Sequence, residues 1–416
     1  ITMMMESKEN NRGDQREVLM EANNLSYKFD DMLNVSVNRT MKKQYFDTRT
    51  YTLPGSGQAV STWNSGVDLI DLRNSYLKLA LTINGGNASF GSGSAMNLIK
   101  SIKILSSSGI ELSRTEDANV YHKFMSRSTH TTDWFQSVGQ LMGFLQPNNF
   151  MTSAPGDSFT FVIPLIELDP FFNLYDNKLL PANVASGCRI EIAWEDMNTA
   201  LLSTAGGITS YTISNIEFRT ESVTLADSAM AILNRESASN GLELTYDRVY
   251  TSPANTGTNL EENLEVRKAV SIAKGVICVC LPLANLNNQQ LDSFLTAETD
   301  YDFSSFDIRL GNNMYPAQPI DTISEAYFNY LKQFGKLKTH GNDTFTNYIE
   351  YNRGSTIICA SFENDDSLNL TGIPVNSSRI AEIRFRRASA TPIKTIAFLT
   401  YTALCRASLS NVSCKI

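Results

Sequence analysis

From Gln44 onward, apolar and polar positions alternate along the chain with the period of a β-strand. Leu77, Leu79, Leu81 and Ile83 alternate with smaller or polar residues, which predicts a half-buried strand. The run LIKSIKILSSSGIEL predicts two strands around a Ser-Ser-Gly turn, and further strands are predicted at SFTFVIPLI, CRIEIAW and YTISNIEFRTESVTL. Together these segments give about eight strands in the first 225 residues, which is the strand count of a jelly roll.

A second β-rich half follows a short helix. Residues 226–240 predict a linker helix that Gly241 closes, and residues 117–146 predict a helical or irregular excursion from the first sheet. One helix, DTISEAYFNYLKQFGK, interrupts the second half and has Gly335 as its predicted end. The strands of this half again number about eight, in LELTYDRVY, VRKAVSIAKGVICVCLPL, SFDIRLGNNMYPAQPI, TIICASFE, RIAEIRFRR and IKTIAFLTYTALCRASL.

The two halves repeat similar features in the same order. The chain from FVIPLIELD to CRIEIAW and the chain from ICASFENDDSLNL to RIAEIRF each contain a strand, an acidic loop, an Asn-Leu, a Leu/Ile-Pro, a Ser and an Arg-Ile before a Glu-Ile strand. The segment with Tyr121 likewise matches the helix with Tyr327. Two unrelated β-sandwiches could share such turn chemistry, but the common order favours a duplication.

We therefore predict an all-β fold with two tandem eight-stranded jelly-roll β-sandwiches and short helical excursions. The predicted division is an N-terminal arm (1–40), a first jelly roll (41–225), a linker helix (226–242) and a second jelly roll (243–416). The arm is expected to be helical or disordered alone and to be ordered by a partner. It contains Arg12-Gly13-Asp14, an integrin-type tripeptide that also arises often by chance.

Composition narrows the function classes. The net charge of −8 argues against a chain that binds nucleic acid by neutralising phosphates, which requires a basic surface. Charged residues make up only 19%, which suits a surface partly buried against copies of the same chain. No apolar run is long enough for a membrane helix, and the N-terminal residues turn charged too early for a signal peptide. We expect neither membrane insertion nor a secretory signal.

The six cysteines lie mostly in apolar runs and form no CxxC pair. We interpret all of them as buried free thiols of a protein that folds in a reducing compartment. They are Cys188, Cys278, Cys280, Cys359, Cys405 and Cys414.

Candidate catalytic chemistry is sparse. The three histidines are His122, His130 and His340; the first two are eight residues apart, without a cysteine or carboxylate at ligand spacing. Sequence signatures of serine hydrolases, phosphate-binding loops, zinc proteases and dinucleotide-binding folds are absent. Carboxylates cluster at Glu191, Glu195 and Asp196 and again at Glu363, Asp365 and Asp366, and Glu191 is expected to face solvent on a strand. We predict no catalytic, cofactor-binding or metal-binding residues and no cofactor.

Two further segments have a structural and a functional interpretation. The glycine-rich stretch 85–94 is expected to be a hairpin tip rather than a phosphate cradle, because no Lys-Ser/Thr follows it. The run Arg384, Phe385, Arg386, Arg387 sends Arg384 and Arg386 to one face of a strand and Phe385 to the core. The arginines are expected either to form local ion pairs on a solvated face or to contact an acidic neighbour or an interior phosphate.

The runs PLIELDPFFNLYDNKLLPANVASGCRIEIAWED (164–196) and SFDIRLGNNMYPAQPIDTISEAYFNYLKQFG (305–335) resemble the double jelly-roll major capsid proteins of the virophage, Polinton-like virus and adintovirus group. The first run resembles the end of their first barrel and the second resembles a strand, a Pro-rich turn and a helical excursion of their second barrel. The resemblance covers most of residues 40–416 and rests on the order of elements and a few short strings.

This resemblance implies a non-enzymatic shell protein, a homotrimer that forms a pseudo-hexameric capsomer in an icosahedral virion. It implies contacts with neighbouring capsomers and with penton and minor capsid proteins. The low net basicity of the chain separately suggests that other proteins pack the genome, so we expect no sequence-specific binding of nucleic acid. It also implies that the helical excursions at 117–146 and 322–335 build towers or contacts between subunits. The alternative from another class is a two-sandwich jelly-roll hydrolase or glycan-binding protein, since a fold does not fix a function. A cell-surface adhesin would need the signal peptide that the sequence does not show.

Overall fold

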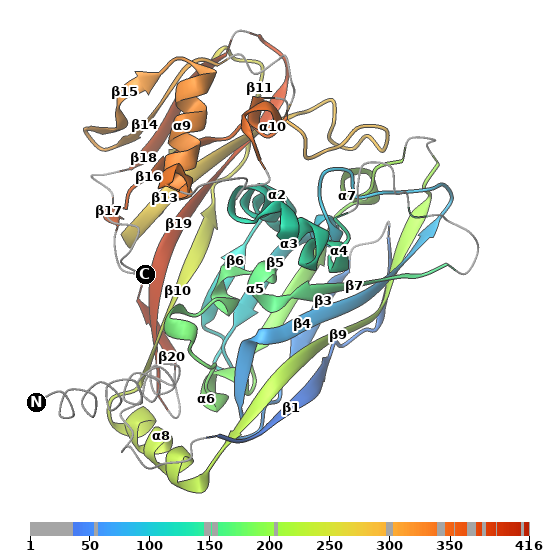
Figure 1. The fold of residues 1–416 in the computed structure, drawn as a ribbon, viewed down its shortest axis with the longest axis vertical. Helices are drawn as coiled ribbons and strands as arrows, with labels where there is room; N and C mark the ends of the chain where they lie inside the picture. The colour runs from blue at the N-terminus through green and yellow to red at the C-terminus, as the bar shows by residue number, and fades with distance from the viewer. Residues whose placement is uncertain are drawn as a thin grey trace, which may run out of the picture.

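The computed structural model describes residues 36–53, 57–144, 151, 157–203, 207–296, 303–338, 346–352, 354–363, 372–376, 380–387, 389–408 and 412–415. They form two β-sandwich units that lie side by side (Figure 1). The first unit contains β1 to β9 and the second contains β10 to β20. The prediction of an all-β fold with two tandem jelly rolls is confirmed.

In the first unit, one sheet has the order β1-β9-β4-β7 with β2 paired to β9, and the other has the order β3-β8-β5-β6. Neighbouring strands are antiparallel throughout both sheets. The strands are β1 (Ser36–Tyr45), β2 (Thr50–Leu53), β3 (Gln58–Thr62), β4 (Leu69–Asn84), β5 (Ile99–Leu105), β6 (Glu111–Thr115), β7 (Phe159–Pro164), β8 (Arg189–Trp194) and β9 (Ser210–Leu225).

In the second unit, one sheet has the order β10-β19-β13-β16 and the other β12-β18-β14-β15. Three short strands join the first of these sheets: β11 and β20 pair with β19, and β17 pairs with β13. The strands are β10 (Leu242–Thr251), β11 (Asn255–Gly257), β12 (Glu261–Val266), β13 (Val270–Pro282), β14 (Phe303–Leu310), β15 (Asn313–Ile320), β16 (Ile358–Ser361), β17 (Ile373–Val375), β18 (Ala381–Arg387), β19 (Ile393–Ala407) and β20 (Val412–Lys415).

The two units therefore have the same strand order. In one sheet of each unit, the strands β1, β9, β4 and β7 of the first unit correspond in order to β10, β19, β13 and β16 of the second unit. In the other sheet β3, β8, β5 and β6 correspond to β12, β18, β14 and β15. Each unit thus has eight principal strands, and the repeat noticed in the sequence reflects a repeat of the fold.

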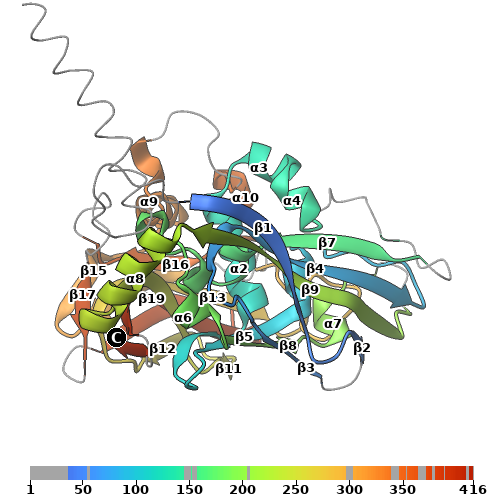
Figure 2. The same ribbon diagram turned by 90° about the horizontal axis from the view of Figure 1, so that it is seen from below.

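Helices occupy equivalent places in the two units. Between β6 and β7 lie α2 (Ala118–Thr129), α3 (Thr132–Gln136) and α4 (Val138–Leu141), and between β15 and β16 lie α9 (Ile323–Gln333), η4 (Lys336–Lys338) and α10 (Tyr348–Asn352). The remaining helices are η1 (Ala95–Leu98), α5 (Leu165–Leu168), η2 (Pro170–Phe172), η3 (Tyr175–Asn177), α6 (Ala182–Ala185), α7 (Met197–Ala200) and α8 (Asp227–Ser239). α8 connects the two units and lies at one end of the molecule (Figures 1 and 2).

The ends of two helices follow from local sequence. Thr322 precedes α9, and its hydroxyl accepts a hydrogen bond from the backbone N–H of Glu325. α8 and α9 end just before Gly241 and Gly335, whose φ angles of 73° and 64° lie in the left-handed region that glycine adopts without strain. Both glycines were predicted to end these helices.

Two hydrophobic cores hold the molecule together, and each contains residues of both units. Val120 and Phe124 of α2 belong to the core of the second unit. Conversely, Leu244 and Tyr246 of β10 and Ala403 of β19 belong to the core of the first unit. α2 therefore lies buried between the units, so this part of the segment 117–146 forms no tower. α3 and α4 of the same segment have one buried residue each, and the expected contacts between subunits stay a prediction.

The structure corrects three further expectations. β1 begins at Ser36, so the segment predicted as an arm ends in five residues of strand; the rest of the arm, including Arg12-Gly13-Asp14, lies outside the described residues. Residues 85–94 do not form a hairpin tip, because they lead from β4 to η1 and β5 in the opposite sheet. Cys405 and Cys414 form a disulfide between β19 and β20, whereas Cys188, Cys278, Cys280 and Cys359 are free and buried as predicted. Nothing in the apolar context of Cys405 distinguished it from the free cysteines.

Candidate functional site

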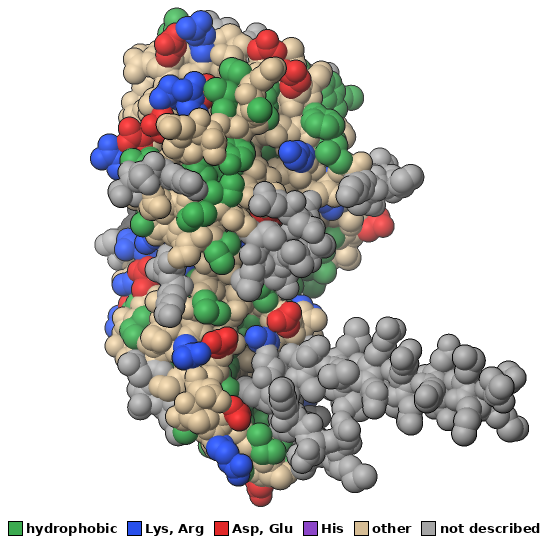
Figure 3. Space-filling model, turned by 90° about the vertical axis from the view of Figure 1, so that its left-hand side faces the viewer, with side chains coloured by type: hydrophobic (Ala, Val, Ile, Leu, Met, Phe, Trp, Pro, Cys, Tyr) green, Lys and Arg blue, Asp and Glu red, His purple; other side chains and the backbone are tan. Residues whose placement is uncertain are grey.

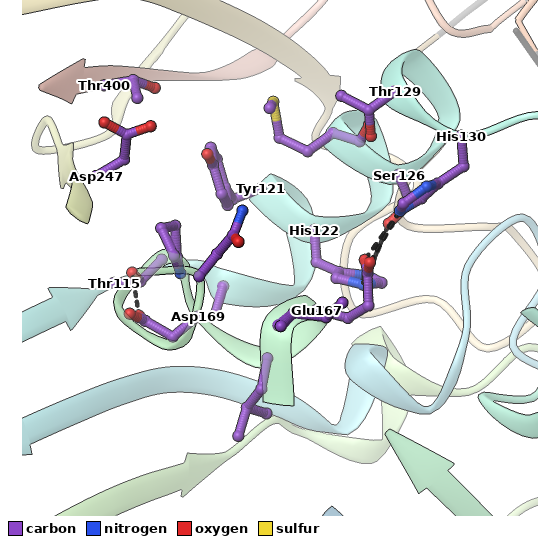
Figure 4. Close-up of a pocket in the computed structure, with 16 residues that line it drawn as sticks. Thr115, Tyr121, His122, Ser126, Thr129, His130, Glu167, Asp169, Asp247 and Thr400 are labelled. Carbon is purple, nitrogen blue, oxygen red and sulfur yellow. Dashed lines mark hydrogen bonds and ion pairs between the residues drawn. The ribbon is translucent and has the colours of Figure 1, made fainter. Parts of the chain in front are cut away.

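A cavity of about 340 Å³ lies where the two units meet. α2 and α5 of the first unit line it together with Asp247 of β10 and Thr400 of β19, both from the second unit (Figure 4). It contains His122 and His130, two of the three histidines of the chain, and we therefore examine it for catalytic or metal-binding chemistry.

His122 and His130 contact the same carboxylate, Glu167 of α5. The Nε2 atom of His130 lies 3.0 Å from one Glu167 oxygen, and the Nε2 atom of His122 lies 3.6 Å from the other. Burial favours the protonated carboxyl, but hydrogen bonds and the charges of the two histidines outweigh it and lower the pKa of Glu167 to about 2. His130 also stacks on Trp134, with 3.8 Å between ring centroids.

This group does not have the geometry of a catalytic triad. The hydroxyl of Ser126 lies 3.1 Å from His122 Nε2, the ring nitrogen that faces Glu167, and 3.5 Å from the other ring nitrogen, Nδ1. In a triad, the nucleophile and the carboxylate occupy opposite nitrogens of the imidazole, so that the carboxylate orients the ring while the other nitrogen takes the proton. In this group the closer contact of Ser126 is with the nitrogen that faces Glu167, so its serine, histidine and glutamate do not lie in the order of a triad.

The other wall of the cavity carries two more carboxylates, each with partners. Asp169 accepts hydrogen bonds from Thr115 Oγ1 at 2.8 Å and from the N–H of Phe171 at 2.9 Å, and burial raises its pKa. Asp247 accepts one from the Tyr175 hydroxyl at 2.5 Å and pairs with Lys274 at 3.2 Å. Burial, with the nearby Asp247, raises the pKa of Tyr175 to about 12. The hydrogen bond between Tyr175 and Asp247 joins the two units, whereas the partners of Asp169 belong to the first unit. Both carboxylates are thus held by the chain's own side chains and backbone.

Throughout the described part of the chain, no three His, Cys, Asp or Glu side chains are arranged to hold a metal ion. His340 lies outside the described residues. Sequence reasoning found His122 and His130 but not Glu167, because that carboxylate is 37 residues from His130 and only the fold brings it close.

The first predicted carboxylate cluster is dispersed among separate contacts. Glu191 faces outward on β8 but is buried, because Arg189 at 2.9 Å and Lys103 at 3.8 Å cover it; the expectation of a solvent-facing residue is wrong. Glu195 accepts a hydrogen bond from Asn119 Nδ2 at 2.9 Å, and Asp196 caps α7 through the N–H of Asn198.

In the second cluster, Glu363 lies 3.5 Å from Lys274, and Asp365 and Asp366 lie outside the described residues. The glycine-rich segment 85–94 offers no phosphate cradle, because the N–H of Ser92 donates to the Asp292 carboxylate at 2.6 Å. A carboxylate at that position repels an anion.

The arginine run on β18 lies as the alternation predicted. Arg384 and Arg386 face outward, and Phe385 is buried. Arg384 pairs with Glu382 at 2.6 Å, and Arg386 pairs with Glu261. Local ion pairs on an outer strand face therefore account for both, and Arg387 is instead buried beside Glu262 at 3.7 Å.

Among the described helices, none combines the length and the apolar character that crossing a membrane requires.

Comparison with solved structures identifies proteins that have a similar fold. No protein-family model and no curated protein sequence matches the chain. Among solved structures, PBCV-1 Vp54, fitted into a reconstruction of the virophage Sputnik, has 12% identity and a TM-score of 0.65, over 94% of this chain and 98% of its own. The Faustovirus major capsid protein has 10% identity and a TM-score of 0.61, over 92% of each chain. The mavirus major capsid protein has 8% identity and a TM-score of 0.54, over 94% of each chain.

At these identities the likeness concerns the fold, and it extends over almost the full length of both chains. It includes both units and their order along the chain. With its two jelly rolls in tandem, this chain has the fold of the viral major capsid proteins of mavirus and Faustovirus.

Proposed function

We propose that this chain is a structural major capsid protein. Three copies form a pseudo-hexameric capsomer, and capsomers tile an icosahedral shell. The observation that carries the proposal is the identical strand order of the two units within one chain. Three chains then supply six similar units, which can pack with near-sixfold symmetry around a threefold axis. The structural similarity to capsid proteins over the whole chain supports the same function.

The mass of the purified protein in solution tests this proposal. We expect a stable trimer of about three times the 46.2 kDa chain, measured by light scattering after size exclusion, and hexagonal particles by electron microscopy. A chain that stays monomeric over the micromolar range contradicts the proposal.

Further partners follow from the same role. We propose contacts with neighbouring capsomers and with penton and minor capsid proteins in the virion, without sequence-specific binding of nucleic acid and without membrane insertion. We also propose the predicted division into an arm, a first jelly roll, a linker helix and a second jelly roll, with boundaries moved to the observed elements: β1 begins at Ser36, α8 covers Asp227–Ser239 and β10 begins at Leu242. The position of α8 between the two sets of strands supports the placement of the linker.

The prediction of assembly in a reducing host compartment now rests on four free cysteines, since Cys405 and Cys414 are joined. Counting thiols in protein purified from particles without reductant tests it: we expect four, and further disulfides among the buried cysteines contradict it.

The alternative, a jelly-roll hydrolase or glycan-binding protein, is not favoured by the site. The cavity between the units holds one Ser-His-Glu group, and its geometry does not fit nucleophilic catalysis. Its carboxylates contact histidine, threonine, tyrosine and lysine side chains of the chain itself. We therefore propose no catalytic role.

A further inference from the structure

The short strand β20 covers part of one edge of β19. β10 pairs with one edge of β19 over residues 398–407, and β13 pairs with the other edge over residues 393–401. β20 pairs with β19 over residues 404–407. Because β10 already occupies its own edge over these residues, β20 lies on the edge that β13 uses, beyond the part that β13 covers. We call β20 the closing strand.

In the first unit, one strand covers the whole of the equivalent edge. β9 and β4 of that unit correspond to β19 and β13, and β4 pairs with β9 between residues 210 and 223. β13 has 13 residues against the 16 of β4, and the closing strand fills the place that β13 does not reach. The closing strand is thus a separate segment, which can leave the sheet while β13 stays paired.

The closing strand also covers apolar side chains of the first unit. Its Val412 is 2% exposed and belongs to the hydrophobic core of the first unit, as do Cys405 and Ala407 of β19. Cys414 packs against the same core. Departure of the closing strand therefore uncovers part of this core.

The sulfur of Cys405 lies beside a hydrogen bond that joins the two units. The Tyr246 hydroxyl of β10 is 3.0 Å from this sulfur, and it donates to the carbonyl of Leu112 of β6 at 2.8 Å. β6 belongs to the first unit and β10 to the second. A rearrangement at Cys405 thus reaches the contact between the units.

Backbone pairing alone holds the closing strand weakly. The strand has four residues, and among the described strands it pairs with β19 only. So short a pairing is marginal in water. The closing strand lies on the side of the molecule that is at the left in Figure 1 and faces the viewer in Figure 3, and its Ser413 is exposed. The disulfide between Cys405 and Cys414, which lie opposite each other in the register, adds a covalent attachment.

This disulfide is open to reducing agents. Cys414 is half-buried, whereas the four free cysteines are at most 2% exposed. A thiolate of a small dithiol attacks one sulfur of the disulfide and breaks the S–S bond, and the second thiol of the reagent then resolves the mixed disulfide. The dithiol loses two electrons and becomes a disulfide, while Cys405 and Cys414 become thiols that carry two protons.

We propose that the Cys405–Cys414 disulfide is a redox latch for the closing strand. When a dithiol reduces it, the closing strand leaves the edge of β19 and the rest of both units stays folded. Exchange with a small disulfide, which takes up the two electrons, restores the bond and returns the strand. The latch is open in a reducing compartment and closed in an oxidising medium. It belongs to the single chain, so it goes beyond the proposed capsid function and does not depend on it.

Amide hydrogen exchange of the full chain at neutral pH, with and without dithiothreitol, tests the latch. Labelling times of seconds to minutes are used, because amides of β4 and β13 exchange more slowly, through unfolding of the units. We expect reduction to accelerate exchange in residues 412–415 by about tenfold or more, since a local opening removes their pairing. Residues 404–407 should accelerate as well. Replacing dithiothreitol by oxidised glutathione should restore slow exchange.

Two variants separate the disulfide from other effects of the reductant. Cys414→Ser removes the latch, so residues 412–415 should exchange fast with and without dithiothreitol. Ser413→Ala, at an exposed residue of the same strand, keeps the disulfide and is the matched control. It should respond to dithiothreitol as the unmodified chain does.

Slow exchange in residues 412–415 of the reduced chain overturns the proposal, because backbone pairing alone then holds the closing strand. Exchange of β4 and β13 on the same short time scale overturns it too, since reduction then opens the units rather than one strand. Alkylation with iodoacetamide during reduction should label Cys414 and leave the four free cysteines unlabelled; labelling of all six contradicts a local opening. The mass of the oxidised chain in solution, which tests the capsid proposal, is measured separately.

Discussion

The side chains of Glu262 and Arg387 are both almost fully buried, and they lie 3.7 Å apart. Arg387 also donates hydrogen bonds to the carbonyls of Asn259 and Thr391, which satisfies a guanidinium that water cannot reach. Removing one member of such a pair is strongly destabilising, because the other is left charged and unpaired. Glu262 and Arg387 are therefore expected to stabilise the fold through their contact with each other.

The contribution of a buried ionic group to stability can be measured for Glu167 through its dependence on pH. Its pKa in the folded chain, about 2, lies below its ordinary value, so its contribution to stability is complete above that ordinary value and is lost as pH falls toward the folded pKa. We expect Glu167→Gln to lower the free energy of unfolding by about 2–3 kcal/mol at pH 6. The difference from the unmodified chain should shrink between pH 5 and pH 3, as followed by denaturant titration.

Glu261→Gln is the control, because Glu261 is an exposed carboxylate that also pairs with an arginine. Exposed ion pairs contribute little, so we expect a change below about 1 kcal/mol with no marked pH dependence. A difference for Glu167→Gln that is constant from pH 6 to pH 3 contradicts the assigned role of the carboxylate.

At the scale of elements, the last two strands are joined covalently. Cys405 of β19 and Cys414 of β20 are paired across a separation of nine residues. Closing a loop of this length restricts the unfolded chain and stabilises the folded one by about 2–3 kcal/mol. We expect Cys414→Ser to lower the free energy of unfolding by about this amount. The variant should also show five reactive thiols in denaturant instead of four.

Reduction provides the control for this variant. Dithiothreitol should destabilise the unmodified chain by a similar amount and leave Cys414→Ser unchanged. Equal sensitivity of both proteins to the reductant excludes a stabilising disulfide at this position.

Equivalent elements of the two units show how burial depends on neighbours. Local pattern placed a helix at DTISEAYFNYLKQFGK and a helical excursion at 117–146, and both are present as α9 and as α2 to α4. The hydrophobic pattern did not predict that α2 would be buried between the units while α9 would be largely exposed. Periodicity reports which side of an element is apolar, whereas the covering partner is set by tertiary packing.

At the scale of the whole molecule, α2 links the stability of both units. Phe124 belongs by sequence to the first unit but packs in the core of the second. We expect Phe124→Ala to lower the free energy of unfolding by about 3–5 kcal/mol, since it leaves a cavity in a packed core. Because the units share cores, amide exchange should accelerate in β13 of the second unit and in β4 of the first.

Leu141→Ala, on the exposed side of α4, is the matched control and should leave both exchange rates unchanged. Faster exchange in β13 alone after Phe124→Ala shows that the units unfold independently, and then the shared cores do not couple them.

Some contacts of the candidate site could be predicted from the sequence, and others became visible only in the tertiary structure. The sequence showed that His122 and His130 lie close on one segment and that Arg384 and Arg386 share a face, because each pair is close along the chain. It missed Glu167 as the partner of both histidines, and it placed Glu191 in solvent although Arg189 and Lys103 cover it. Long-range partners depend on how strands and helices cross, which local spacing does not record.

The amino-acid sequence by itself determined the alternation of the strands, the helix ends at Gly241 and Gly335, and the repeat that makes two jelly rolls. These features follow from side-chain periodicity and backbone preference, which act over a few residues. Only the tertiary structure decided the shared cores, the disulfide and the contrast between covered α2 and open α9. These features depend on which segments, far apart in the sequence, come into contact in the fold. Whether a residue is buried is set by both contacting segments and cannot be derived from one of them alone.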